Sequence, residues 1–338
     1  MFSSGPTDTI LDVAGLAVGH AQDNEAMTGL TVLLSPAGAV AGGDLRGGGS
    51  GLREANLLDP RTTTDIVHAI VLSGGSAFGL DASGGVMTWL EEQGIGFDTG
   101  VAKVPLVPQA ILFDLGLGSS RIRPDQAMAR KACSQAITDG TLLLQGNVGA
   151  GTGASIGKLR GGVGAMKSGI ASASIQLAGG FTVGALVAVN ALGDVYENGQ
   201  IIAGMLDVER GGFADSSQCL LAMAQAAAKA APATAERVSG PMPGCNTTIG
   251  IIACNGRFTK AQCGKIAAMG HNGMARAIRP VHTTADGDML FCLATGEITM
   301  PLDAAGEMAA IAVERAIIKA VKACGAAGGL PAWQDFQK

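Results

Sequence analysis

The sequence predicts a layered α/β or α+β fold in which helices cover long strands. Continuous apolar runs have the length of buried strands, and longer stretches carry apolar residues at helical spacing. The composition agrees, since 47% of the 338 residues are hydrophobic and 15% are charged. A chain of this length fits one large domain or two ordinary ones, and it can bury a sizeable core.

The first half of the chain alternates strands with helices. Residues 28–36 and 38–49 are predicted as two strands that end in Gly-rich turns, and residues 67–75 as a buried strand. Two helical stretches follow, one over 76–94 and one over 125–140, where Asp139-Gly140 is the expected stop.

The second half begins with two strands in residues 169–195, which are joined at Gly179-Gly180. An Ala-rich helix over 216–236 runs into a linker broken by Pro232, and residues 237–246 have the most linker-like composition of the chain. The remaining predicted elements are a strand over 247–256, a helix over 259–278, a turn and strand over 281–297 and a last helix over 304–325.

Charge and cysteine usage exclude several classes of protein. The net charge of −5, without a basic patch, argues against a nucleic-acid partner. No apolar stretch is long enough to span a membrane, and the first residues lack the pattern of a secretory signal. The seven cysteines show no CxxC spacing and the four histidines no metal spacing. We therefore expect a cytoplasmic protein with reduced thiols, no membrane contact, no metal and no cofactor.

Thr247 opens a predicted buried strand directly after the Pro/Gly-rich segment. Its hydroxyl could attack the carbonyl of Asn246, and water could then cleave the resulting ester. The new terminal amine would have a pKa of about 7.7–8.0 and could serve as the base for its own hydroxyl. The structural alternative is that Thr247 and Thr248 are ordinary β-branched strand residues.

A set of segments, in order and at consistent spacing over nearly the whole chain, resembles the L-aminopeptidase/D-esterase family, which includes β-peptidyl aminopeptidases and the nylon-oligomer hydrolase. The Asn246-Thr247 junction is similar to that of the branch with a Thr nucleophile. The segments are GLAVGHAQD, GAVAGGDLRGGGSGLRE, NLLDP, HAIVLSGGSAFGLDA, VPQAILFDL, GNVGAGTGASIGK, GALVAVNALGDV, NTTIGIIA and ARAIRPVHTTADGDMLF.

The resemblance implies a four-layer αββα sandwich, like that of N-terminal nucleophile hydrolases, as a single domain over 1–338. It also implies autoproteolysis between Asn246 and Thr247 into an α subunit, 1–246, and a β subunit, 247–338. Thr247 takes the place of the nucleophile, and Asn190 takes the place of the residue that donates to the oxyanion.

Three more residues receive catalytic roles from the resemblance. Lys158 matches an active-site lysine, and Asp286 and Asp288 would position groups and tune proton transfer. Each has a structural alternative: a solvated lysine for Lys158, an Asp-Gly hairpin turn for the aspartates, and a strand-ending turn for Asn190.

The Gly-rich segments match no phosphate-binding motif, so we expect them to approach the substrate with their backbone. The predicted pocket residues are Gly75, Ser76, Phe113 and Gly149. Some relatives carry Tyr where this chain has Phe113, and Phe cannot donate a hydrogen bond.

The expected activity is hydrolysis of amide or ester bonds in short peptides, amino-acid amides or ω-amino-acid oligomers, through an acyl-enzyme on Thr247. Two alternatives stay open: an acyltransferase on the same scaffold, like the ornithine acetyltransferases, and an unprocessed binding protein without catalysis. The expected partners are a small peptide or amide substrate and further copies of the chain, in a tetramer of processed αβ units.

Overall fold

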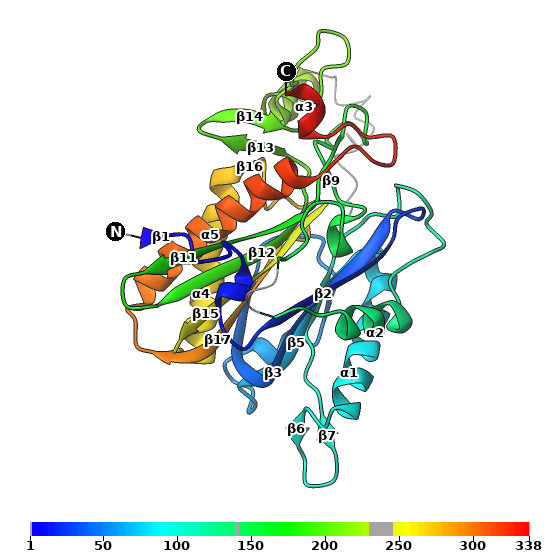
Figure 1. Cartoon of the computed structure of the whole chain (residues 1–338). Coiled ribbons are helices and arrows are strands. Elements are labelled where there is room, and N and C mark those ends of the chain that lie inside the picture. Colours follow the sequence, from blue (N-terminus) through cyan, green and yellow to red (C-terminus); the bar gives the residue numbers. More distant parts are fainter. Residues whose placement is uncertain (1, 139–141, 230–245, 338) are drawn as a thin grey trace.

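The structure is a computed structural model that describes residues 2–138, 142–229 and 246–337. Its main feature is a ten-stranded sheet in the order β1-β11-β12-β15-β17-β3-β5-β8-β4, with β2 paired to β3 (Figure 1). The strands are β1 (Phe2–Ser3), β2 (Ala17–Asp23), β3 (Thr28–Leu45), β4 (Leu52–Arg53), β5 (Ile66–Ser73), β8 (Gln109–Ile111), β11 (Ile170–Leu177), β12 (Thr182–Asn190), β15 (Thr247–Gly256) and β17 (Met289–Ile298).

Strand β3 joins two halves of this sheet. Its first part, through Leu34, pairs with β2 and β5, and its second part, from Val40, pairs with β17. The register shifts between Leu34 and Ala39, where Gly38 has a φ of +80°. The prediction of two separate strands in 28–49 was therefore wrong, because Pro36 and Gly38 form a bulge within one strand rather than a turn between two.

The side chains of the two halves alternate between an inner and an outer face. Leu186, Ile251 and Phe291 from one half share a core with Ile70 and Leu72 from the other, so the two halves pack face to face. Their sequence neighbours, at odd spacing from these residues, point to the opposite faces, as a period of two requires.

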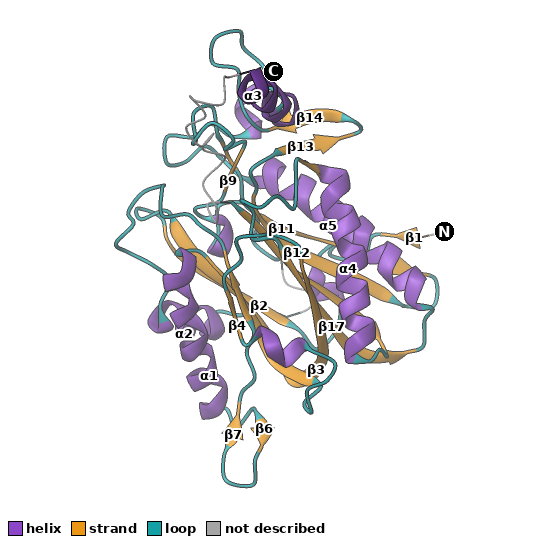
Figure 2. Cartoon of the chain, turned by 180° about the vertical axis from the view of Figure 1, so that it is seen from behind, coloured by secondary structure: helices purple, strands orange, loops and turns teal. Residues whose placement is uncertain are grey.

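Helices cover both outer faces. Helices α4 (Lys260–Ala277) and α5 (Leu302–Ala323) pack on the half that contains β12, β15 and β17. Helices α1 (Ala82–Glu92) and α2 (Gln126–Ser134) pack on the half that contains β2 and β5. The two helix pairs lie on opposite sides of the sheets in both views (Figures 1 and 2). The expected αββα sandwich is confirmed.

Most of the predicted elements are present, with two differences in the helices. Residues 76–81 form a short 3-10 helix (Ser76–Asp81), so α1 begins only at Ala82. Helix α2 ends at Ser134, short of the predicted 140, because the backbone of Ile137 exchanges two hydrogen bonds of 2.9 Å with Val18 of β2. The predicted stop at Asp139-Gly140, Pro232 and most of the linker, up to residue 245, lie outside the described residues.

Smaller elements lie at the ends of the sandwich. A three-stranded sheet of β13 (Asp194–Glu197), β14 (Gln200–Ala203) and β16 (Ile278–Arg279) lies with α3 (Ser216–Lys229) at the top of Figure 1. The pairs β6 (Phe97–Asp98) with β7 (Lys103–Val104) and β9 (Ser155–Ile156) with β10 (Met166–Lys167) complete the strands. Among the described residues, no helix is both long and apolar enough to cross a membrane.

Candidate active site

Three strands bring the predicted catalytic residues together. Asn190, the last residue of β12, pairs with Thr247, the first residue of β15. Strand β17 runs parallel to β15, with Met289 opposite Ile249. Because parallel strands begin at the same edge of a sheet, the segment before β17 carries Asp286 and Asp288 to the start of β15. The predicted residues therefore meet at one edge of the central sheet.

The peptide bond between Asn246 and Thr247 lies at the centre of this cluster. The Thr247 hydroxyl donates to the carbonyl oxygen of Asn246, which also accepts a hydrogen bond of 2.8 Å from the backbone N–H of Gly287. Thr247 is 1% exposed, and Asn246 pairs with Asp286 in a bridge. A hydroxyl and a carbonyl polarised by an N–H donor are thus held against each other away from water.

The two carboxylates hold different backbone segments of the site. Asp288 Oδ1 accepts the backbone N–H of Thr248 at 2.7 Å. Asp286 accepts the backbone N–H groups of Leu192 at 3.3 Å and Thr283 at 3.0 Å. Burial, and then the nearby charge of Asp288, raises the pKa of Asp286 to about 6.

Asn190 and Lys158 form a second group beside Thr247. Lys158 Nζ donates to Asn190 Oδ1 at 2.7 Å and to the Asn190 carbonyl at 3.0 Å, and the Ser155 N–H also donates to Oδ1, at 3.1 Å. Asn190 Nδ2 donates to the carbonyl of Phe113 at 2.9 Å and has a second N–H. The amide is therefore fixed with its nitrogen away from Lys158.

The structural alternatives describe these residues only in part. Lys158 is half-buried and bound to Asn190 rather than solvated. Asn190 does end a strand, as its alternative had it, but it is fully buried and paired with Thr247. Asp286 and Asp288 precede β17, which pairs in parallel with β15 and antiparallel with the distant β3, so they do not form a hairpin turn.

The predicted pocket residues divide into two groups. The backbone N–H of Gly75 donates to Asp114 Oδ1 at 2.7 Å, and that of Ser76 donates to the Leu112 carbonyl at 3.0 Å. Both therefore contact the segment whose Phe113 carbonyl touches Asn190.

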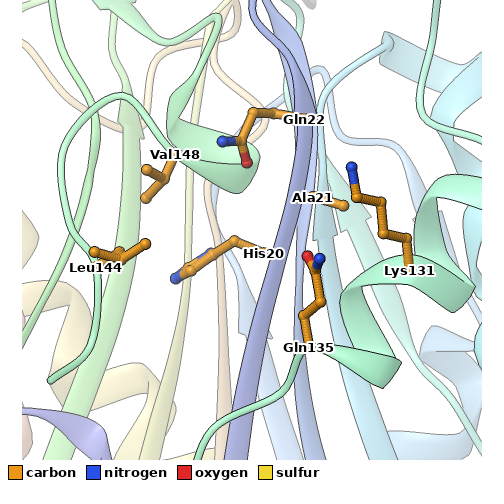
Figure 3. A pocket seen from close by; sticks show the side chains of 7 residues that line it. All are labelled: His20, Ala21, Gln22, Lys131, Gln135, Leu144 and Val148. Carbon is orange, nitrogen blue, oxygen red and sulfur yellow. The ribbon is translucent and has the colours of Figure 1, made fainter. Parts of the chain in front are cut away.

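Gly149 lies elsewhere, with its N–H donating to Gln22 Oε1 at 3.1 Å. The adjacent Val148 lines a cavity of about 180 Å³ between β2, α2 and the 144–148 segment (Figure 3). The other lining residues are His20, Ala21, Gln22, Lys131, Gln135 and Leu144. The described residues contain no group of three or more His, Cys, Asp or Glu side chains that could hold a metal ion.

Several residues that hold this site were not predicted from the sequence. Gly287 contacts the Asn246 carbonyl, Thr283 holds Asp286, and His282 Nδ1 lies 2.8 Å from Asp288 Oδ2. All belong to the HTTADGD segment, of which only the two aspartates were predicted as site residues. Lys167 was also missed; its fully buried ammonium donates to the carbonyls of Gly151 and Ala154, each at 2.9 Å.

Solved structures show first which fold the chain has. The L-aminopeptidase D-Ala-esterase/amidase of Ochrobactrum anthropi, a serine aminopeptidase with a variant of the Ntn hydrolase fold, superposes with a TM-score of 0.68 at 20% identity, covering 97% of this chain and 90% of that one. A β-aminopeptidase of Burkholderia sp. gives 0.68 at 21% identity, with 96% and 89% covered. The chain therefore has the fold of the Ntn hydrolase aminopeptidases.

The chain belongs to peptidase family S58, whose model matches residues 8–331. An uncharacterised aminopeptidase of Mycobacterium bovis is 42% identical over 329 residues, which cover 94% of this chain and 90% of the relative. The 6-aminohexanoate-oligomer endohydrolase of Kocuria sp. is 33% identical over 302 residues, which cover 88% and 78%. The chain is thus a peptide-bond hydrolase, as the resemblance in its sequence implied.

Proposed function

We propose that the chain cleaves itself between Asn246 and Thr247 and that the new N-terminal Thr247 is the nucleophile of an amide hydrolase. One observation carries this proposal: the Asn246 carbonyl oxygen is held between the Thr247 hydroxyl and the N–H of Gly287. The hydroxyl is thus beside the bond it would attack, and the N–H lies where negative charge would develop.

Self-cleavage would proceed through an ester. Thr247 Oγ1 forms a bond to the Asn246 carbonyl carbon, the bond to the Thr247 nitrogen breaks, and the hydroxyl proton passes to that nitrogen. Water then hydrolyses the ester, which leaves a carboxylate on Asn246 and a free α-amine on Thr247. Both steps conserve atoms without any added reactant except water.

The mature site would use the same residues on a substrate. The α-amine of Thr247 accepts the hydroxyl proton as the oxygen attacks a substrate amide, and it later protonates the leaving amine. The second N–H of Asn190 Nδ2 stabilises the oxyanion, while the Lys158 ammonium favours negative charge nearby. Water releases the acyl group from Thr247.

The substrates that fit this proposal are short peptides, amino-acid amides and ω-amino-acid oligomers. The relative named as a 6-aminohexanoate-oligomer endohydrolase supports the last class, and the aminopeptidase relatives support the first two. The proposed oxyanion contacts act on the reacting carbonyl, which all three classes share, so one site can serve all three.

A product assay tests the proposal. Purified protein is incubated with an amino-acid amide and with a 6-aminohexanoate oligomer, and the released amines are quantified with and without an added amine acceptor. We expect hydrolysis by the wild type, none by Thr247→Ala, and little acyl transfer to the acceptor. Hydrolysis at the wild-type rate by Thr247→Ala would contradict the proposed nucleophile.

A further inference from the structure

His282 places two donors on one oxygen of Asp288. Its backbone N–H donates to Asp288 Oδ2 at 3.0 Å, and its ring Nδ1 lies 2.8 Å from the same atom. His282 has a φ of +58°, in the left-handed region that residues other than glycine seldom adopt. This backbone conformation directs both the main chain and the ring of His282 toward one carboxylate.

Asp288 connects His282 to the residue after the nucleophile. Its other oxygen, Oδ1, accepts the N–H of Thr248 at 2.7 Å, and its side chain is 1% exposed. A carboxylate buried to this degree must be fully hydrogen-bonded to stay ionised. The His282 ring supplies one of its three donors, and the other two come from the backbone.

His271 of α4 holds the His282 ring in place. The two ring centroids are 4.7 Å apart in an edge-to-face arrangement, and His271 Nε2 lies 2.9 Å from the carbonyl oxygen of Asp44. A carbonyl can only accept, so His271 carries its proton on Nε2; an ionised Asp288 likewise requires the proton of His282 on Nδ1. Burial lowers the pKa of His271 to about 4, so it packs against His282 as a neutral ring.

The two carboxylates of the site therefore have different surroundings. Asp288 has an imidazole that can carry positive charge, whereas Asp286 is held by Thr283 and the Leu192 backbone, which are neutral. Among the described residues, Asp288 of its own segment and His271 of α4 contact the His282 ring; Asp44 contacts His271 in turn, and Arg46 contacts Asp44.

We propose that His282 is a positioning residue that keeps Asp288 ionised and fixed on the Thr248 N–H, so that any proton shared by the carboxylate pair resides on Asp286. This inference rests on the proposed role of Thr247 as the nucleophile. The raised pKa of Asp286, which burial and Asp288 produce, agrees with this division of roles. His282 acts through Asp288 and does not touch the reacting atoms.

The test compares His282→Ala and His282→Asn in the mature enzyme. Alanine removes the ring donor, whereas Asn places an amide N–H near the position of Nδ1 and tolerates positive φ. We measure kcat as a function of pH. We expect the acid limb of this profile to lie about one pH unit higher in His282→Ala than in the wild type, which is a tenfold change in the ionisation equilibrium. KM should change little, and His282→Asn should move the limb less than His282→Ala does.

His20→Asn is the matched control, because His20 lies on β2 beside the cavity of Figure 3, away from this site, and should leave the profile unchanged. A profile of His282→Ala that coincides with the wild type would overturn the inference. If His282→Ala fails to fold, His282→Gln is compared with His282→Asn, because the side-chain amide of Gln lies one bond farther from the backbone. Equal pH profiles of these two variants would also overturn the inference.

Thr247→Ala separates this inference from the proposed function. If Thr247→Ala is inactive and the pH profile of His282→Ala is not shifted, the assignment of Thr247 as the nucleophile stands and only the role proposed for His282 is refuted. An active Thr247→Ala would instead remove the proposed function itself. The shift in the acid limb, if present, must also disappear in the Asp288→Asn background, since His282 would then have no carboxylate to hold.

Discussion

Gly287 lies against the Thr247 hydroxyl, and a Cβ on residue 287 would come within 2.8 Å of that oxygen and of the Gly49 carbonyl oxygen. Its N–H is the donor on the Asn246 carbonyl, so the same residue must supply the hydrogen bond and leave the space beside the hydroxyl free.

Gly287→Ala is expected to slow self-cleavage about tenfold, since displacing one preorganised donor costs one or more kcal/mol of transition-state stabilisation. The fraction of full-length chain is followed over time on a denaturing gel. Gly325→Ala is the control, because a Cβ there meets nothing within 4 Å. Cleavage of Gly287→Ala at the wild-type rate would show that this contact does not matter for the reaction.

Asp286 makes stability depend on pH. Its pKa in the folded chain is raised from 3.8 to about 6, so between these values the folded state keeps a proton that the unfolded state releases. The contribution of this group to stability is therefore greatest below pH about 4 and declines as pH rises to about 6.

In an unbroken Thr247→Ala background, the free energy of unfolding in urea is measured with Asp286 and with Asp286→Asn. The free energy of unfolding of the Asp286 chain minus that of the Asp286→Asn chain should fall by up to about 3 kcal/mol from pH 4 to pH 7. A difference that is constant or that rises with pH would contradict the raised pKa of Asp286.

At the scale of elements, the strands with buried faces were predictable because short, continuous apolar runs are typical of buried strands. The strands predicted within residues 67–75, 169–195 and 247–256 are present as β5, β11, β12 and β15. The bulge in β3 and the early end of α2 were not predictable, because a Pro-Gly turn and a bulge share one composition and the bridge of Ile137 to Val18 is a long-range contact.

The same limit applies to the candidate site. The local sequence offered Thr247 as a nucleophile and the family resemblance added Asp286 and Asp288, but only the parallel register of β15 and β17 brings them together. His282 and Gly287 could not be singled out, since their roles depend on a left-handed backbone and on a contact across two strands. A histidine or glycine in a loop has no sequence pattern that reports such contacts.

Two glycines of helix α4, Gly264 and Gly273, differ in the space that surrounds them. A Cβ at Gly273 would overlap the backbone of Ala310 in α5, whereas one at Gly264 has only the Gly43 carbonyl oxygen at 3.8 Å. Gly273→Ala should therefore lower the free energy of unfolding by about 1–3 kcal/mol, and Gly264→Ala should leave it unchanged or raise it by up to about 1 kcal/mol. Urea unfolding in the Thr247→Ala background measures both, and equal stabilities would refute the close helix contact.

At the scale of the whole molecule, the proposed cut does not separate two domains. The segment after it contributes the adjacent strands β15 and β17 and the covering helices α4 and α5, all within the same sandwich as the described residues before it. Strand β15 is hydrogen-bonded to β12 of the preceding segment, and β17 to β3. Cleavage at Asn246 would therefore leave both core faces in place.

The two fragments are accordingly expected to stay together in native buffer and to separate only on denaturation. Size-exclusion chromatography of cleaved protein should give one species that contains both fragments. Loss of the smaller fragment from that species would show that the strand pairing across the cut is too weak to hold the molecule together.

Intact mass spectrometry with N-terminal sequencing tests the central claim most directly. The wild type should give two fragments whose masses match residues 1–246 and 247–338, with the smaller beginning at Thr247, and Thr247→Ala should give one unbroken chain. An active wild-type sample in which every chain remains unbroken through Asn246-Thr247 would contradict the account.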